Sequence, residues 1–390
     1  IYITGQAYGG APTNYDMVTI KYNSLGAEQW VSTYNGTGNG NDVANSIDVD
    51  SSGNVYITGS GFESASNSFD YITIKYNSSG VQSWVSIYNG VSNFIDVSND
   101  IILDNAGNVY ITGASYEQFY DFATIKYNNA GVQQWVSRYN GQTSGNDEAN
   151  TILLDAIGNV FVSGNGRVNG TFNDIILIKY DNSGVRQWQR NYNGPGNAQD
   201  STASAAIDSD GNIVLTGFYT GTGLTKDIAT IKYSNSGVLE WAAIFNGTDN
   251  GNDIGYSVAI NNTGDYYVAG KVFKTNTNDD ITIIKYTTPI GIHQTNSIVT
   301  NDFELSDNYP NPFNPSTIIS YQLLIPSRVK LNVYSLTGQF VDILVDAFQT
   351  PGTYSVNFNA SKYSEMSSGI YFYKLETNYS SDIKKMIFTK

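Results

Sequence analysis

The sequence has no cysteine and only one histidine, His293. The absence of cysteine excludes disulfides, thiolate metal ligands and a cysteine nucleophile. A single histidine excludes most metal centres built on imidazole and leaves one candidate for a Ser-His-Asp triad. His293 stands beside Gly291 and Ile292, outside the repeated part of the chain, so we expect no catalytic role for it.

Charged residues and long apolar runs are also scarce. Charged side chains make up 14% of the 390 residues, against about 25% in typical soluble domains. No run of about 18 apolar residues is present, so no membrane-spanning helix is expected. The net charge of −15, nearly all of it on residues 1–292, lacks the basic footprint that nucleic acid requires.

What the sequence does contain is a repeat with a period of 51 to 54 residues. Its marker is the tripeptide Ile-Lys-Tyr, which begins at Ile20, Ile74, Ile125, Ile178, Ile231 and Ile284. A tryptophan follows the motif lysine by nine residues in the first five copies, and Gln294 replaces it in the sixth. Self-similarity at this period is typical of propellers and other repeat architectures.

Each period predicts four short strands separated by turns rich in Gly and Asn. In one copy the strands are residues 99–104, 109–113, 121–128 and 134–141, each rich in β-branched or aromatic residues. Small residues such as those at 203–206 suit strands near a central axis, and the tryptophan strand suits the outer rim. The pattern predicts an all-β fold in which residues 1–292 form a β-propeller of about six four-stranded blades.

The first and last blades each contain three predicted strands, which gives 22 strands in place of 24. The sequence starts within a repeat, because residues 1–5 align with residues 55–59. We therefore expect that the natural N-terminus, with a signal peptide, lies upstream of Ile1. The alternative is that another segment, such as Ser297–Leu305, fills an open edge in its own ring or in a neighbour's.

The repeats resemble the SBBP-type β-propeller repeat of secreted bacterial proteins. The resemblance rests on D-S-S-G-N-V-Y-I-T-G at 50–59 and on D-Y-I-T-I-K-Y-N at 70–77. It implies a fold and a surface location, and it implies no chemistry.

Beyond a linker at 293–302, residues 303–390 predict a small immunoglobulin-like β-sandwich. Six strand-like runs lie near 317–325, 328–335, 339–345, 353–359, 369–377 and 383–389. F-E-L-S-D-N-Y-P-N-P-F-N-P-S-T at 303–317, S-G-I-Y-F-Y-K-L at 368–375 and K-M-I-F-T-K at 385–390 resemble the C-terminal sorting domain of the type IX secretion system. That resemblance implies a Gram-negative bacterium, the type IX translocon as partner, and an extracellular or outer-surface location.

An aspartate stands five residues before every motif lysine. The functional interpretation is a ring of carboxylates for calcium or acid–base chemistry. The structural interpretation, which we favour because the pattern occurs in every repeat, is a buried ion pair between each aspartate and its lysine. The aspartates are Asp16, Asp70, Asp121, Asp174, Asp227 and Asp280, and the lysines are Lys21, Lys75, Lys126, Lys179, Lys232 and Lys285.

A second aspartate precedes each inner strand, at Asp42, Asp96, Asp147, Asp200 and Asp253. Calcium requires six to eight oxygen ligands, and the two repeats with Phe94-Ile95 and Ala198-Gln199 lack the extra ligands, so turn capping is the favoured interpretation. The D-S-S-G-N-type segments are interpreted as hairpin turns because no Lys-Ser/Thr follows, as a phosphate loop requires.

Residues that break the repeat are the remaining candidates. The arginines Arg138, Arg167, Arg186 and Arg190 suit an acidic glycan or a partner carboxylate, although simple surface solvation is the favoured interpretation. The non-repeating glutamates are Glu63, Glu117 and Glu148. None of these residues forms a recognisable catalytic, cofactor or metal motif, and we assign no such site and no cofactor.

The sequence therefore predicts a secreted, non-enzymatic structural protein of the cell surface or extracellular space. Its propeller would serve self-assembly or adhesion, and a monomer completed by upstream strands is the alternative to assembly. A glycan-binding module that uses loop Tyr, Asn and Asp is the alternative function. A propeller hydrolase or lyase would need a unique carboxylate pair, which the sequence does not show.

Overall fold

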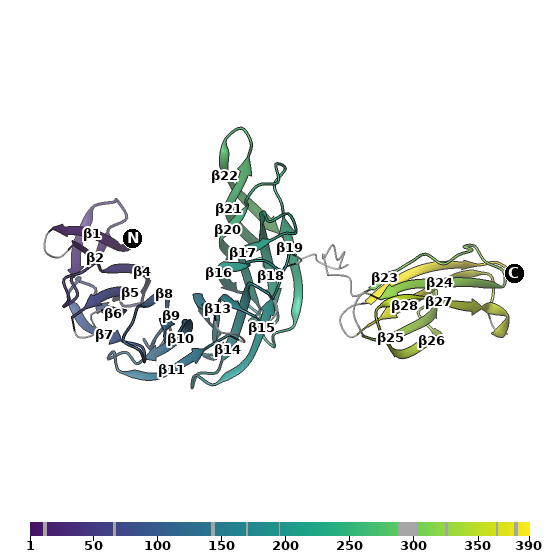
Figure 1. Ribbon diagram of the computed structural model, residues 1–390, viewed down its shortest axis with the longest axis horizontal. Coiled ribbons are helices and arrows are strands. Elements are labelled where there is room, and N and C mark those ends of the chain that lie inside the picture. Colours follow the sequence, from purple (N-terminus) through teal and green to yellow (C-terminus); the bar gives the residue numbers. More distant parts are fainter. Residues whose placement is uncertain are drawn as a thin grey trace. The chain divides into compact units, whose positions relative to one another are not determined.

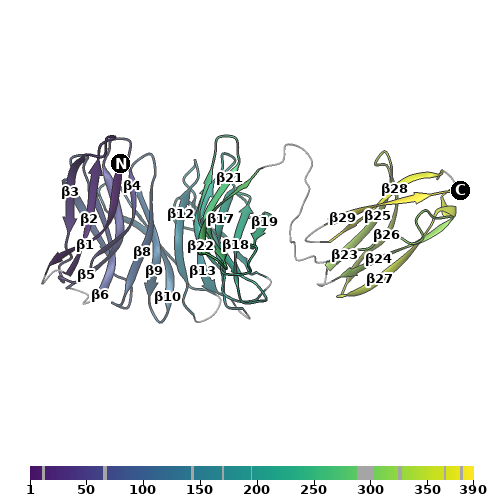
Figure 2. The ribbon, with the colours of Figure 1, turned by 90° about the horizontal axis from the view of Figure 1, so that it is seen from above.

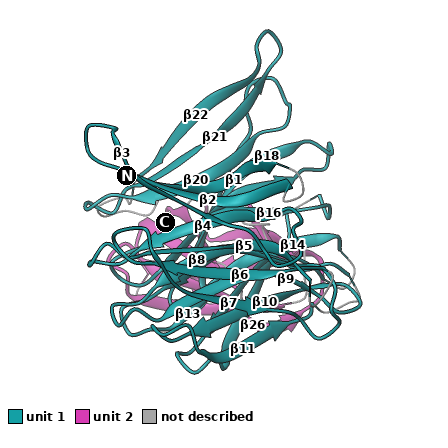
Figure 3. Cartoon of the chain, turned by 90° about the vertical axis from the view of Figure 1, so that its left-hand side faces the viewer, with its two compact units in different colours: residues 1–297 teal, residues 298–390 magenta. Residues whose placement is uncertain are grey.

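The computed structural model describes residues 1–10, 14–64, 68–141, 145–168, 171–194, 196–287, 303–323, 327–363, 366–377 and 381–390. These ranges contain 29 β-strands and one short 3₁₀ helix, Ala360–Lys362. The chain divides into two compact units, Ile1–Ser297 and Ile298–Lys390 (Figure 3). The all-β fold class is confirmed. The boundaries drawn from the sequence at 292 and 303 stay a prediction, because residues 288–302 lie outside the described ranges.

Unit 1 consists of six antiparallel sheets, which we number 1 to 6 in chain order. Sheets 1 and 6 have three strands each, and sheets 2 to 5 have four, as the repeat pattern predicts. Sheet 1 contains β1 (Tyr2–Gly10), β2 (Asn14–Tyr22) and β3 (Glu28–Tyr34); sheet 2 contains β4 (Val43–Val49), β5 (Val55–Glu63), β6 (Ser68–Tyr76) and β7 (Gln82–Tyr88); sheet 3 contains β8 (Asp96–Leu103), β9 (Val109–Tyr116), β10 (Tyr120–Tyr127) and β11 (Gln133–Tyr139); sheet 4 contains β12 (Glu148–Leu154), β13 (Val160–Arg167), β14 (Asn173–Tyr180) and β15 (Arg186–Tyr192); sheet 5 contains β16 (Ser201–Ile207), β17 (Ile213–Thr220), β18 (Lys226–Tyr233) and β19 (Leu239–Phe245); sheet 6 contains β20 (Ile254–Ile260), β21 (Tyr266–Lys274) and β22 (Asn278–Tyr286).

The sheets follow one another along an open arc, with sheets 1 and 6 at its two ends (Figures 1 and 2). The first strands of sheets 2 to 6 pack against each other in sequence, β4 on β8, β8 on β12, β12 on β16 and β16 on β20. The tryptophan strands β3, β7, β11, β15 and β19 form the opposite edge of their sheets. The strands with small residues are therefore the inner ones, as predicted.

Five apolar clusters join consecutive sheets. The cluster between sheets 4 and 5 contains Ile175 and Leu177 of β14 together with Ile213 and Leu215 of β17. β-branched and aromatic residues occupy both faces of the strands, so a sheet buries one face on the sheet before it and the other on the sheet after it. Burial of this apolar surface stabilises unit 1 by about 25 cal/mol per Å².

Hairpin turns of the D-x-x-G-N type set the register between the first two strands of each sheet. The Oδ1 atom of Asp50 accepts hydrogen bonds from the backbone N–H groups of Ser52 and Asn54, both at 2.9 Å. Gly53 adopts a φ of +78°, a conformation that glycine tolerates without steric cost. The interpretation of these segments as turns is confirmed.

Unit 2 has two antiparallel sheets around one core. One sheet has the order β23 (Phe303–Leu305), β24 (Ser316–Leu323) and β27 (Gly352–Asn359); the other has the order β26 (Phe340–Gln349), β25 (Ser327–Ser335), β28 (Gly369–Glu376) and β29 (Ser381–Phe388). Ile319 and Phe358 of the first sheet share the core with Leu331, Val333 and Tyr373 of the second. All six predicted strands are present.

Strand β23 corrects one expectation about the linker. The segment Ser297–Leu305 was a candidate to fill an open edge of the propeller. Its last three residues instead pair with β24, because Phe303 and Leu305 are buried in the core of unit 2. Residues 297–302 lie outside the described ranges.

Candidate functional site

The motif lysines do not pair with the aspartates five residues before them. Lys126 donates a hydrogen bond to the Asn182 side chain in the next sheet, and its ammonium lies 4.9 Å from the ring centroid of Tyr110. Asp121 instead lies 3.4 Å from the guanidinium of Arg138. The predicted ion pair is therefore wrong. Side chains alternate along a strand, so residues five apart point to opposite faces.

The same arrangement recurs at other junctions. Lys75 and Lys179 donate to the side chains of Asn129 and Asn235 in the following sheets. Lys232 differs, because it forms ion pairs with Asp208 at 3.2 Å and Glu240 at 3.0 Å. Burial lowers the pKa of Lys75, Lys126 and Lys179. Lys75, Lys126 and Lys179 therefore connect neighbouring sheets, whereas both ion pairs of Lys232 lie within sheet 5.

A double-mutant cycle tests whether Asp121 and Lys126 interact. Because Asp121 and Lys126 lie on opposite faces of β10, the losses of unfolding free energy in Asp121→Ala and Lys126→Met should add within about 0.5 kcal/mol in the double variant. Urea denaturation followed by tryptophan fluorescence measures all three variants. Recovery of most of the Asp121→Ala loss by the second change would restore the ion-pair interpretation.

The aspartates before the inner strands are fully buried. The Oδ2 atom of Asp200 accepts from the backbone N–H of Gly194 at 2.6 Å, and Oδ1 accepts from that of Thr220 at 2.9 Å. Asp42, Asp96, Asp147 and Asp253 make the corresponding pair of bonds. The capping interpretation is confirmed, and these carboxylates join the end of one sheet to the next.

Four of the five capping aspartates lie near an aspartate of the first series from the preceding sheet, in the pairs Asp42 with Asp16, Asp147 with Asp121, Asp200 with Asp174 and Asp253 with Asp227. Burial raises the pKa of Asp147 to about 6, and the negative charge of Asp121 adds to the shift. Burial likewise raises the pKa of Asp174 to about 6, with a contribution from Asp200. The Oδ1 atoms of Asp121 and Asp174 are buried without a hydrogen-bond partner among the described residues.

Among the described residues, no group of three or more His, Cys, Asp or Glu side chains is placed to hold a metal ion.

These pKa shifts predict an inverted pH dependence. A carboxyl group whose pKa is near 6 in the folded protein binds a proton more tightly than in the unfolded chain, whose aspartates titrate near pH 3.9. Its stabilising contribution is complete below pH 4 and is lost as the pH rises through 6. We expect urea denaturation at a series of pH values from 4 to 7.5 to show that Asp174→Asn loses about 1–2 kcal/mol less stability over this range than wild type.

The Asp174→Asn variant is compared with wild type because carboxyl groups with a lowered pKa make stability rise with pH, which opposes the effect of Asp174. Burial would raise the pKa of Asp50, Asp155 and Asp208, but hydrogen bonds from their turns outweigh it and lower their pKa. These groups are unchanged in Asp174→Asn. An identical pH profile in the two proteins would contradict the prediction.

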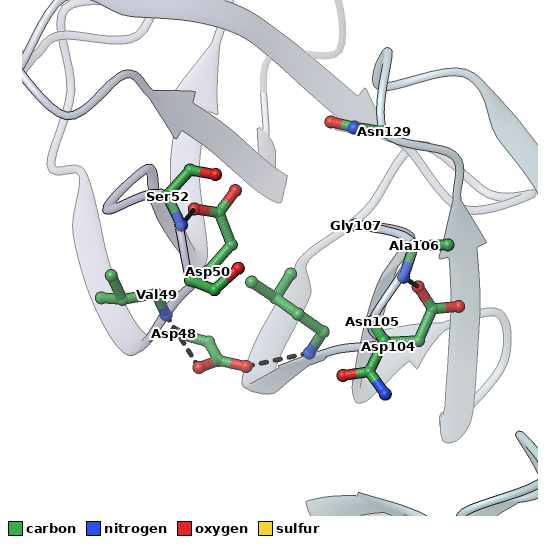
Figure 4. Close-up of a pocket in the computed structure, with 11 residues that line it drawn as sticks. Asp48, Val49, Asp50, Ser52, Asp104, Asn105, Ala106, Gly107 and Asn129 are labelled. Atoms are coloured by element: carbon green, nitrogen blue, oxygen red, sulfur yellow. Dashed lines mark hydrogen bonds between the residues drawn. The ribbon is translucent and has the colours of Figure 1, made fainter.

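A polar pocket of about 340 Å³ lies between the hairpin turns of sheets 2 and 3 (Figure 4). Its polar lining includes Asp48, Asp50, Asp104 and Asn129. Asp48 accepts from the backbone N–H groups of Val49 at 2.8 Å and Leu103 at 2.9 Å (Figure 4). Both carboxylate oxygens of Asp50 and of Asp104 accept hydrogen bonds from residues of their own turns. The pocket suits hydrogen bonding to a small polar group better than acid–base chemistry.

Two of the arginines connect sheets rather than face solvent or a ligand. Arg138 donates to the Ser115 hydroxyl at 2.7 Å and the Tyr88 hydroxyl at 3.2 Å. Arg190 donates to the Gly237 carbonyl of the next sheet and lies over the Trp188 ring. For these two residues the structure shows contacts at sheet junctions, where planar guanidinium groups match carbonyls and aromatic rings, and binding of a glycan or partner carboxylate stays a prediction. Arg186 lies over the Tyr139 ring, 5.7 Å from its centroid. The backbone N–H of Arg167 donates to Asp147.

The three non-repeating glutamates occupy different sheets. Glu63 is buried and accepts from the Tyr34 hydroxyl at 3.0 Å. Glu117 lies 3.9 Å from Arg138, and Glu148 accepts from the Asn99 side chain at 3.3 Å. His293 lies outside the described ranges.

The junction residues that the sequence did not reveal are asparagines and glycines in the turn between the third and fourth strands. Trp84 donates from its indole N–H to the Asn129 carbonyl at 3.0 Å, and its ring lies against Gly131. Trp135 and Asn182 repeat the contact. The recurrence of Asn, Asp or Ser, two variable residues and Gly after Ile-Lys-Tyr in the first five copies was the available signal.

Family comparison identifies unit 2. Residues 307–389 match the family described as secretion system C-terminal sorting domain, and residues 30–61 match the β-propeller repeat. The chain carries a type IX sorting domain. The protein is therefore secreted through that system to the cell surface or the extracellular space. No described helix has the length and apolar composition needed to cross a membrane.

A search of the curated proteins found no match. Among solved structures, the chain is similar to PorZ, a surface component of the type IX secretion system of Porphyromonas gingivalis, with a TM-score of 0.40 and 11% identity. The match covers 100% of this chain and 58% of that one. A protein of unknown function from Dyadobacter fermentans gives 0.39 and 9%, with coverage of 82% and 95%. An endo-arabinanase from Bacillus licheniformis gives 0.28 and 15%, with coverage of 62% and 92%.

Proposed function

We propose that the protein is a non-enzymatic structural component of the cell surface or extracellular matrix. In this proposal the six sheets are β-propeller blades used for self-assembly or adhesion, and the sorting domain is an immunoglobulin-like module recognised by the type IX translocon. The observation that carries the proposal is the use of the repeated polar residues as links between sheets. A residue that occurs in every repeat and contacts the next sheet has a structural role.

Successive junctions between sheets share the same kinds of contact. Capping aspartates such as Asp200 join backbone segments, lysines such as Lys126 reach the next turn, and tryptophans such as Trp84 cover its glycine. Arg138, a residue that breaks the repeat, serves a junction as well. The low charged fraction leaves a surface poorly protected against association.

Light scattering and electron microscopy of the 390-residue chain over a range of concentrations test the proposal. We expect ordered assemblies that grow with concentration, or attachment of the protein to cell surfaces. A monodisperse monomer at high concentration that binds no cells would contradict it.

A second candidate function, glycan binding, is favoured by an aromatic cluster at sheet 3 in which exposed Phe94 lies beside two half-buried tyrosines, Tyr116 and Tyr120. Phe94 is 58% exposed, and its ring centroid lies 5.2 Å from that of Tyr116, which is 5.3 Å from that of Tyr120. Glu117 follows directly in the chain and supplies a hydrogen-bond acceptor. Aromatic faces with polar neighbours are typical of ligand sites. A glycan array with wild type and Phe94→Ser decides: binding that the substitution removes would favour this function.

A further inference from the structure

The four-stranded sheet of unit 2 has one face in the core of the unit and an outer face that carries exposed apolar residues. Leu331 and Val333 of β25 lie in the core, so Asn332 and Tyr334 point to the outer face. On the neighbouring edge strand β26, Phe340, Ile343 and Phe348 are 57%, 47% and 69% exposed. Exposed apolar residues gathered on one face of a sheet mark a site of interaction.

The strand register joins these residues into rows that cross the sheet. One row, from β26 to β29, consists of Phe340, Tyr334, Phe372 and Lys385. The next row on the same face consists of Ile343, Asn332, Lys374 and Ile383. The ring centroids of Tyr334 and Phe340 are 6.1 Å apart. Residues directly opposite one another in a sheet have their side chains on the same face, so the aromatic and aliphatic groups form one patch.

The outer face of this sheet is basic, although the chain has a net charge of −15. Arg328 pairs with Asp346 at 3.0 Å, and Lys374 pairs with Glu376 at 2.7 Å. The other two cations of this face, Lys330 and Lys385, form no ion pair with any residue that the structure describes. A partner for this face therefore combines an apolar surface with negative charge.

The charge and the family of unit 2 favour a receptor protein over other partners. Recognition of anionic lipids takes clusters of about four to eight basic residues, and the outer face has two unpaired lysines. A second copy of the same face would meet it with like charges, which disfavours the contact. Residues 307–389 match a secretion-system sorting domain, and sorting requires a receptor that binds this domain.

We propose that the outer face of the sheet β26-β25-β28-β29 (Figure 2) is the surface through which an acidic, partly apolar receptor of the type IX secretion system binds the sorting domain. This inference rests on the proposed recognition of unit 2 by the translocon and names the surface of contact. Burial of the exposed apolar side chains supplies most of the affinity. Lys330 and Lys385 fix the orientation of the receptor by charge.

Export of the full chain tests this surface. The 390-residue chain, joined to a signal peptide, is produced in a bacterium that has the type IX system, and immunoblots of the periplasm, the cell surface and the medium measure the exported fraction. Ile343→Glu replaces an apolar contact by a charge that an acidic receptor repels. It should weaken recognition by about tenfold and leave most of the protein in the periplasm. Lys330→Glu should act in the same direction, and Lys330→Arg should be exported like wild type.

The matched control is Ile318→Glu, on the other sheet of unit 2. Ile318 of β24 is 50% exposed, close to the 47% of Ile343, but it is paired with Asn357 and lies outside the outer face described above. We expect Ile318→Glu to be exported like wild type. Substitutions at exposed positions change stability little, and the resistance of unit 2 to protease in the purified variants confirms that it is folded.

The export pattern separates the proposed surface from other roles of the outer face. Equal export of Ile343→Glu and wild type would overturn the inference and leave recognition of the domain standing. Retention of Ile343→Glu and Ile318→Glu alike would also overturn it, because the effect would then not depend on the face. Normal export of Ile343→Glu together with weaker association in light scattering would assign the face to a second copy. Equal export of the wild-type chain from a host without the type IX translocon would reject the proposed recognition itself.

Discussion

Replacing Asp200 by alanine should lower the free energy of unfolding of the repeat unit by about 3–5 kcal/mol, because two buried N–H groups lose their acceptor. Those groups belong to Gly194, which follows β15 of sheet 4, and to Thr220, which ends β17 of sheet 5. The Asp200 side chain is 0% exposed, so water does not replace the carboxylate. Urea denaturation followed by tryptophan fluorescence measures the loss.

Two variants serve as controls for this prediction. Asp200→Asn keeps one carbonyl oxygen and should lose about half as much. Asp210→Ala removes an exposed carboxylate from the adjacent turn and should change stability by less than about 0.5 kcal/mol. Equal stability of Asp200→Ala and Asp210→Ala would show that the buried carboxylate does not join the two sheets.

A second large effect is expected at the glycine that lies beneath a tryptophan. A Cβ atom at Gly131 would lie 2.7 Å from the Trp84 ring, and the residue has a φ of +77°. Gly131→Ala should therefore destabilise unit 1 by about 3–4 kcal/mol, through both the left-handed conformation and the steric clash. Chemical denaturation measures the change.

The chain offers a matched control at Gly26. This glycine occupies the equivalent turn of sheet 1 with the same φ of +77°, and nothing lies within 4 Å of its Cβ position. Gly26→Ala should lose only about 1–2 kcal/mol, the cost of the left-handed conformation. Similar losses for the two variants would mean that the ring of Trp84 yields to the methyl group.

The sheets were predictable because their signals are local and repeated. Period-2 strands and turns with Gly at positive φ, such as Gly53 and Gly107, depend on neighbouring residues alone. Strand β23 lies within Ser297–Leu305, a segment that was a candidate edge strand of the propeller, and its pairing with β24 of unit 2 is a tertiary contact that no local pattern indicates.

The partners of the charged residues were harder to predict. Lys126 bonds to Asn182, 56 residues later, and no local pattern indicates a contact across one repeat. Strand alternation places Asp121 and Lys126 on opposite faces, whereas the cost of an unpaired buried charge favours an ion pair between them, so the sequence alone supports both outcomes.

The row of junctions has a consequence for how such a protein changes over generations. Each interior sheet packs on the sheet before it and the sheet after it, through the same capping aspartate and, at most junctions, the same tryptophan. Insertion or deletion of one whole repeat therefore restores an equivalent junction on both sides and disturbs no other sheet. Unequal recombination between repeats can alter the length of the molecule in one step without a loss of fold, so variants that differ in repeat number should be equally able to fold.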